Sequence, residues 1–243
     1  IFWWEFIHRF LGRLIGVFFF FPLIFFIVKL GFNKTKNLFI IFILICLQGF
    51  IGWYMVSSGL INRVDVSHYR LSLHLVFAFI ILSLIFWNYL KYKEINYSNK
   101  KIKSFLPLIF LLLIFIQISI GAFVSGLDAG EIYNSWPLMG SSYFPDDNLI
   151  VDLFNISAFS DPSLVQFMHR NLAYLIFFFY LLILFVVYKN NLSAFFKATY
   201  MIGFLLVLQI VLGILTLLSS AQIIISSMHQ ISSIFLVSSS IYL

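Results

Sequence analysis

Four of the five histidines in this chain of 243 residues stand near the amino ends of long apolar segments, at His8, His74, His169 and His229. An ionisable side chain inside a bilayer is costly, so its presence there indicates a functional site. Imidazole nitrogens in an apolar helical bundle bind heme iron, zinc or copper. These residues therefore predict a centre built on histidine ligands. The fifth, His68, lies at the outer edge of its segment and is interpreted as an interfacial residue.

Heme fits these histidines better than zinc or copper does. Zinc would need further close ligands on the same helices, and copper would usually recruit Cys or Met. A small residue follows each histidine at i+4, where a flat ligand could lie against the helix, although plain helix packing gives a similar pattern. These small residues are Gly12, Ala78, Ala173 and Ser233. Four arginines are expected to bind heme propionates. The alternative is that their side chains snorkel from the helix ends toward the membrane surface. These arginines are Arg9, Arg13, Arg70 and Arg170.

The elements that position these residues are membrane-spanning helices. Hydrophobic residues make up 62% of the chain and charged residues only 10%, whereas a soluble domain carries about 25% charged residues. The composition predicts an all-α integral membrane protein, and the net charge of +6 reports topology rather than nucleic-acid binding. The segments long enough to span a bilayer are 5–30, 37–58, 68–90, 104–126, 165–188, 196–218 and 222–243.

The connections between these segments predict the orientation. The lysines fall in or beside alternate connections, which the positive-inside rule places in the cytoplasm. The four histidines are therefore expected near the opposite, extracytoplasmic surface. An acidic connection at 127–164 lies on that same side and is long enough to predict a functional loop.

The sequence also contains an internal repeat. The segment Glu5-Phe6-Ile7-His8-Arg9 aligns with Gln166-Phe167-Met168-His169-Arg170, and Leu-Gln-x-x-x-Gly at 47–52 aligns with 208–213. A third Gln-x-x-x-Gly lies at 117–121. The repeat predicts two pseudosymmetric four-helix bundles, an N-terminal half at 1–103 and a C-terminal half at 104–243. It pairs His8 with His74 and His169 with His229, and it predicts a first span before residue 1, making eight with the seven visible ones.

One difference between the repeats bears on chemistry. Glu5 occupies the place of Gln166 and lies three residues before His8, on the same helix face. A carboxylate beside only one histidine couple predicts chemistry at that couple and a prosthetic heme at the other. The alternative is an interfacial Glu5 that pairs with Arg9 at i+4.

These residues resemble a known family. Glu5-Phe6-Ile7-His8-Arg9-Phe10-Leu11-Gly12-Arg13 resembles the Glu-x-x-His-Arg-x-x-Gly-Arg motif of the heme A synthase family, also called CtaA/Cox15. The resemblance extends over essentially the whole chain and is closest to the alphaproteobacterial and mitochondrial branch. Its other motifs are Arg70-Leu71-Ser72-Leu73-His74, Gly126-Leu127-Asp128-Ala129-Gly130, Pro137-Leu138-Met139-Gly140, Gln166-Phe167-Met168-His169-Arg170 and Met228-His229-Gln230.

The resemblance implies roles for these residues. His169 and His229 would ligate a permanent heme b, and His8 and His74 would bind the substrate heme O or its product heme A. Glu5 would match the proposed catalytic carboxylate in the oxidation of the heme O C8 methyl to a formyl group. Heme A then serves cytochrome c oxidase, so heme O synthase and the oxidase assembly machinery are the implied partners, with a homo-oligomer and the electron acceptor left open. The expected location is the bacterial inner membrane, with the heme sites toward the periplasm.

Two other functions remain as alternatives. A di-heme quinol oxidoreductase of cytochrome b type would usually place hemes on both sides of the membrane, whereas these histidines share one side. A non-enzymatic heme transporter or chaperone would have exchangeable heme at both sites and would not need Glu5.

Overall fold

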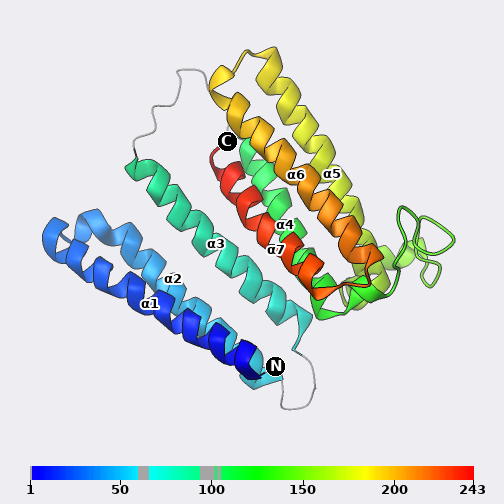
Figure 1. Cartoon of the computed structure of the whole chain (residues 1–243), viewed down its shortest axis with the longest axis horizontal. Helices are drawn as coiled ribbons and strands as arrows, with labels where there is room; N and C mark the ends of the chain where they lie inside the picture. The colour runs from blue at the N-terminus through cyan, green and yellow to red at the C-terminus, as the bar shows by residue number, and fades with distance from the viewer. Residues whose placement is uncertain (1, 60–65, 94–101, 103–104) are drawn as a thin grey trace.

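The computed structural model describes residues 2–59, 66–93, 102 and 105–243, and its ordered elements are helical (Figure 1). The predicted boundary between the halves, at 103 and 104, lies outside the described residues. The described part contains no strand, only an isolated bridge between Met139 and Ser142. The long helices are α1 (Phe2–Leu30), α2 (Phe32–Gly59), α3 (His68–Tyr92), α4 (Phe105–Gly126), α5 (Pro162–Lys189), α6 (Phe196–Leu218) and α7 (Ile223–Ile241).

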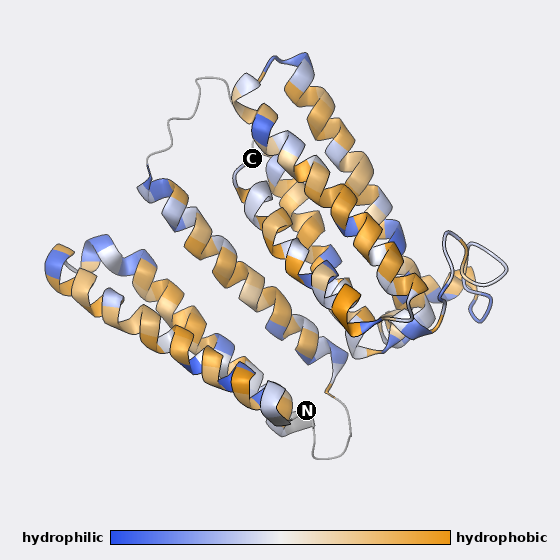
Figure 2. Ribbon diagram, viewed as in Figure 1, coloured by the Kyte–Doolittle hydropathy of each residue, from blue (hydrophilic) through white to orange (hydrophobic). Residues whose placement is uncertain are grey.

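Each of these 7 helices is long and apolar enough to cross a membrane. Figure 2 shows apolar residues along the helix bodies, with hydrophilic residues gathered near the helix ends and in the connections. The predicted class, an all-α integral membrane protein with seven visible spans, is confirmed. The chain is a multi-pass membrane protein.

Helices α2 and α5 begin earlier than hydropathy predicts, because polar residues occupy their first turns. The expected span at 37–58 starts at Phe32, directly after a connection that consists of Gly31 alone. Gly31 has a φ of 81°, which favours glycine, and its N–H donates to the Ile27 carbonyl at 2.9 Å. The expected span at 165–188 starts at Pro162, where the Asp161 carboxylate accepts the Leu164 N–H at 2.9 Å as an N-cap.

The helices pack unevenly along the chain. Helices α4, α5, α6 and α7 pack against one another as a bundle, and α3 lies along α4 and α7 (Figure 1). Helices α1 and α2 form a hairpin that joins the rest through contacts between α2 and α3. The main cluster of buried apolar side chains draws on α3 to α7 and includes Phe79, Phe110, Ile183, Ile202 and Val237. The hairpin thus lies beside the main core and contributes no buried residue to that cluster.

The amino ends of α1, α3, α5 and α7 lie at one end of the molecule, where the connection 127–164 also folds (Figure 1). That connection contains three short 3-10 helices, Ala129–Glu131, Ile150–Phe154 and Ile156–Ser160. It contacts α3 through a hydrogen bond of 2.9 Å between the hydroxyls of Tyr69 and Ser160. The end of the molecule that carries the histidines is therefore covered in part by an ordered loop.

The close approach of α3 and α4 at this end depends on Gly126. A Cβ built on Gly126 would lie 2.8 Å from both Cα and Cβ of His68. We expect Gly126→Ala to force the two helices apart and to lower the free energy of unfolding by about 1–3 kcal/mol, the usual cost of overpacking. Thermal unfolding in detergent measures the effect.

Gly16→Ala is the matched control, because in the part of the chain that the structure describes no atom outside the α1 backbone lies within 4 Å of a Cβ built at Gly16. That variant should unfold at or above the temperature of the parent, since alanine is the better helix former. Equal melting temperatures for Gly126→Ala and Gly16→Ala would contradict the packing argument.

Candidate functional site

His8 on α1 and His74 on α3 bring their imidazole rings together across the helices. The ring centroids are 6.4 Å apart and the ring planes make an angle of 73°. The two residues are far apart in the sequence, and α2 lies between their helices in chain order. The predicted first histidine couple is therefore present as a pair of neighbouring rings.

His169 on α5 and His229 on α7, which the repeat predicts to be the second couple, both lie in the bundle of α4 to α7. Within the described residues, Nδ1 of His169 and Nδ1 of His229 are both buried and have no hydrogen-bond partner. Buried polar atoms almost always have a partner, so an unpartnered one points to an ion, ligand or water.

Gly12 leaves open space on the helix face four residues after His8. Apart from the backbone of α1 itself, no heavy atom of the described residues lies within 4 Å of a Cβ built there. Glu5, His8 and Arg9 are likewise exposed on α1. This face of α1 can thus accept a flat ligand beside the His8 ring.

Glu5 and Gln166, which align in the repeat, each accept a hydrogen bond from an arginine one turn later. Arg9 donates to Glu5 in an ion pair, and Arg170 donates to the Gln166 Oε1 at 3.1 Å. The pairing that the sequence offered as an alternative role for Glu5 is therefore present. It occurs in both repeats and does not by itself distinguish the two couples.

Gln166 also donates hydrogen bonds that an ionised carboxylate could not donate. Its amide nitrogen donates to the carbonyls of Ala129 at 2.8 Å and Tyr133 at 3.2 Å. A glutamate has no N–H to donate to these carbonyls when it is ionised. Part of the difference between Glu5 and Gln166 thus follows from the attachment of the loop to α5.

Arg170 also attaches the loop to α5. Its guanidinium donates to the carbonyls of Tyr133 at 3.0 Å, Ser135 at 3.0 Å and Leu138 at 3.3 Å. Its Nε is buried without a partner among the described residues. Four of the five guanidinium N–H groups are therefore accounted for.

The other candidate arginines have different surroundings. The Arg70 guanidinium lies over the Tyr54 ring, 5.2 Å from its centroid, as a cation–π contact. Arg9 contacts Glu5, and Arg13 is exposed on α1. Arg9, Arg13 and Arg70 therefore belong to the first couple's helices, α1 and α3, whereas Arg170 belongs to the second couple.

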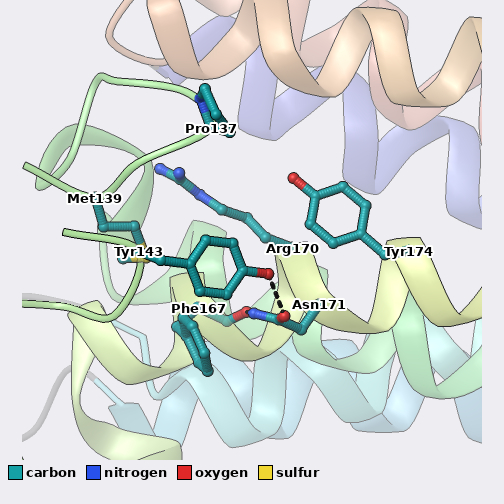
Figure 3. Close-up of a pocket in the computed structure, with 7 residues that line it drawn as sticks. All are labelled: Pro137, Met139, Tyr143, Phe167, Arg170, Asn171 and Tyr174. Atoms are coloured by element: carbon teal, nitrogen blue, oxygen red, sulfur yellow. Dashed lines mark hydrogen bonds between the residues drawn. The ribbon is translucent and has the colours of Figure 1, made fainter.

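A shallow recess lies where the loop meets α5. Figure 3 shows Arg170 and Tyr174 among its lining residues, with the Tyr143 hydroxyl donating to Asn171. The Trp136 indole N–H donates to the Tyr174 hydroxyl at 2.9 Å on the same side of α5. Among the described residues no histidine lines this recess. The recess therefore belongs to the contact between the loop and α5 rather than to a histidine couple.

Acidic residues of the loop act as internal acceptors. Asp146 accepts hydrogen bonds from the hydroxyls of Ser142 at 2.7 Å and Ser141 at 2.8 Å. These bonds hold the pKa of the Asp146 carboxyl below its ordinary value. Asp147 accepts from Ser163 at 2.6 Å and Tyr133 at 3.0 Å. The acidity of this loop is thus largely used to order the loop itself.

Sequence reasoning did not assign a role to three glutamines that contact the histidines. Gln48, Gln117 and Gln209 each donate to the backbone carbonyl of a histidine on the next long helix. The signal was present in the repeated Gln-x-x-x-Gly motif, which we interpreted only as a mark of the repeat.

Comparison with known proteins places the chain in a family. The COX15-CtaA family, described as cytochrome oxidase assembly protein, matches residues 1–241. The chain belongs to this family. It is 48% identical over 243 residues to the heme A synthase of Pelagibacter ubique, covering 98% of this chain and 71% of that protein. It is 40% identical over 242 residues to the heme A synthase of Rickettsia felis, covering 96% and 71%. No solved structure matches it.

The loop network predicts a change at acid pH. Because the folded-state pKa of Asp146 lies below the ordinary value of 3.8, its carboxylate stabilises the folded loop above that value. This stabilisation is lost as the pH falls through the lower folded-state pKa. Protection of the peptide 141–148 against hydrogen exchange, normalised to the intrinsic rate at each pH, should therefore persist down to about pH 4 and fall below it.

Asp146→Asn provides the control for this prediction. The amide cannot lose a charge, so exchange in that variant should depend less on pH in the same range. Identical acid profiles for the parent and Asp146→Asn would show that another group controls the loop.

Proposed function

We propose that this chain is a heme A synthase, an oxidoreductase that converts heme O into heme A by oxidising the C8 methyl group to a formyl group. The observation that carries the proposal is the neighbouring pair His8 and His74, with ring centroids 6.4 Å apart. Membership of the family and the names of the similar proteins support the same assignment. The conversion replaces two hydrogens of the methyl carbon with one oxygen, a four-electron oxidation for which an electron acceptor takes up the electrons and a co-substrate supplies the oxygen.

The separation of the two rings suits one iron atom. A metal–nitrogen bond to histidine is about 2 Å long, and the ligating nitrogen lies about 1 Å from the ring centre, so two opposed imidazoles span roughly 6 Å. The observed 6.4 Å agrees with this span. The open face at Gly12 supports the placement of a flat macrocycle beside His8. We therefore assign His8 and His74 as the axial ligands of the substrate heme.

We assign His169 and His229 to a permanent heme b. Their Nδ1 atoms are buried without partners, and both helices belong to the bundle that holds the apolar core. Such an environment suits a large apolar prosthetic group that is retained. A bound heme b would supply one-electron redox chemistry at this site.

Arginines at the same end of the helices are proposed to bind the propionates. Arg9, Arg13 and Arg70 serve the first couple, since they lie on α1 and α3. Arg170 serves the second couple, although its role is limited to the Nε–H, because its other donors already bind Gln166 and the loop carbonyls. Arginine suits this task because its planar guanidinium matches a carboxylate.

Glu5 is the proposed catalytic carboxylate. It lies on α1 one turn before His8, so a substrate held by His8 brings its periphery near the Glu5 side chain. There the carboxylate can accept a proton from water or from a hydroxylated substrate, and it can stabilise positive charge that builds on the carbon. Arg9 holds the carboxylate in place through the ion pair.

The remaining proposals concern the cell. We place the protein in the bacterial inner membrane with both histidine couples toward the periplasm, on the basis of the lysine distribution. Heme O synthase would supply the substrate, and cytochrome c oxidase would receive heme A during its assembly. The family description, cytochrome oxidase assembly protein, supports the second of these links.

Glu5→Gln tests the catalytic assignment. The amide retains the shape of the side chain but cannot accept the proton, so heme A yield should fall by about 100-fold or more while heme O stays bound. Extraction and mass analysis of hemes from cells that also make a heme O synthase measures both quantities. A normal yield of heme A would remove Glu5 from the mechanism.

Alanine variants of the histidines test the two heme sites separately. His74→Ala should abolish heme A formation and lose substrate heme, yet retain heme b. His229→Ala should lose heme b from the purified protein. His68→Ala is the control, because His68 packs against Phe123 and Tyr69 outside both couples, and it should retain both hemes. Full heme content in the first two variants would overturn the proposed function.

A further inference from the structure

The Gln-x-x-x-Gly motif has the same structural setting on three helices. It occurs as Gln48 and Gly52 on α2, Gln117 and Gly121 on α4, and Gln209 and Gly213 on α6. In each case the motif packs against a histidine on the next long helix. The three histidines, in order, are His74, His169 and His229.

Each glutamine forms a hydrogen bond across the helix interface at the depth of the histidine. Its amide nitrogen donates to the histidine's backbone carbonyl, at 3.0 Å for His74, 3.0 Å for His169 and 2.9 Å for His229. A helical carbonyl has a second lone pair, so this bond adds to the helix's own hydrogen bonding. The bond fixes the axial register between the two helices at the histidine.

Two of the glutamines also contact the imidazole ring. The amide nitrogen of Gln48 lies 3.2 Å from Nδ1 and 3.3 Å from Nε2 of His74. The amide nitrogen of Gln117 lies 3.3 Å from Nε2 of His169. The amide oxygens of both glutamines are buried without a partner among the described residues. Leaving such an acceptor unpaired is costly, which indicates that these amides are placed for their N–H groups.

Each glycine supports the edge of the same ring. A Cβ would lie 2.9 Å from Cε1 of His74 at Gly52 and 3.0 Å from Cε1 of His169 at Gly121. At Gly213 the distance to Cε1 of His229 would be 3.2 Å. These distances are shorter than ordinary van der Waals contacts. A methyl group at Gly52 would therefore displace the His74 ring, and at Gly121 and Gly213 the facing ring would have to move by a few tenths of an ångström.

We propose that each Gln–Gly pair is a positioning device that sets the depth and the ring orientation of an axial histidine. The inference rests on the proposed function, because it takes His74, His169 and His229 as heme ligands. Plain packing of small residues would explain the glycines alone, but it does not explain a glutamine that bonds to the histidine each time. The pairs act through the histidines and do not touch the reacting atoms.

The third pair has an additional hydrogen-bonding partner, Ser232, so the size of the effect of losing the glutamine should differ between the pairs. The Gln209 amide also donates to the Ser232 hydroxyl at 2.8 Å, and that hydroxyl donates to the His229 carbonyl at 3.0 Å. The His229 carbonyl thus receives two side-chain donors. Loss of Gln209 alone should therefore have a smaller effect at its histidine than loss of Gln48 has at His74.

The test uses Gly52→Ala, Gly121→Ala and Gly213→Ala in the protein that carries both hemes. Gly49→Ala on α2 is the matched control, because no described atom outside the α2 backbone lies within 4 Å of a Cβ built there. Electron paramagnetic resonance and optical spectra report the ligand geometry of each low-spin heme, and heme titration reports its affinity. Changes in residues that orient a metal ligand typically cost about 10–100-fold in affinity.

We expect each variant to disturb one site only. Gly52→Ala should change the spectrum and lower the affinity of the heme at His8 and His74, whereas Gly121→Ala and Gly213→Ala should do so at His169 and His229. The undisturbed heme in the same protein reports that the variant has folded. Gln48→Met should act like Gly52→Ala, and Gln209→Met should need Ser232→Ala to reach the same effect.

Two results would overturn the inference in distinguishable ways. If the alanine variants have the spectra and affinities of Gly49→Ala while His74→Ala and His229→Ala still lose heme, the positioning role is wrong and the proposed function stands. If the histidine variants themselves retain full heme, both the proposed function and the positioning role fail.

Discussion

Two imidazole rings can share one iron only if their helices hold them about two bond lengths and two ring radii apart, and under the proposed function this requirement constrains the helices that carry them. His8 and His74 meet it at a separation of 6.4 Å. Their helices are not consecutive, and α1 is held against α3 mainly through α2. The bond from Gln48 on α2 to the His74 carbonyl lies at the same depth. Helix α2 therefore has to fix the axial positions of both α1 and α3.

The hydrogen bond from an arginine to the side chain one turn earlier occurs in both repeats, but that side chain has different contacts in each. An arginine donates to the side chain one turn earlier in both, to Glu5 in the first and to Gln166 in the second. In the second repeat the paired side chain must also donate to two loop carbonyls, which requires an amide. The choice of residue at this position thus reflects what the paired side chain has to contact, in addition to any chemistry at the neighbouring histidine.

The helices could be predicted from the sequence because hydropathy and length determine which segments can span a bilayer. The segment 196–218 has the same bounds in the structure, as α6 (Phe196–Leu218). The pairing of His8 with His74 followed from the repeat and agrees with the distance between their rings. The bonds of Arg170 could not be predicted, because their acceptors are carbonyls of an irregular loop whose path depends on tertiary contacts. The contacts of Gln117 could not be predicted either, because a motif shows the spacing along one helix and not which residue of a neighbouring helix faces it.

The placement of the apolar core has a consequence for ligand exchange. The core cluster is built from α3 to α7, and the α1–α2 hairpin stands beside it with a single residue, Gly31, between its helices. Regions with few buried contacts open locally at a lower free-energy cost than the core does. His8 lies on α1 in that hairpin, whereas His169 and His229 lie on α5 and α7 in the bundle. Within the described residues, opening the first couple would move a helical hairpin relative to α3, while opening the second would separate helices that share the core.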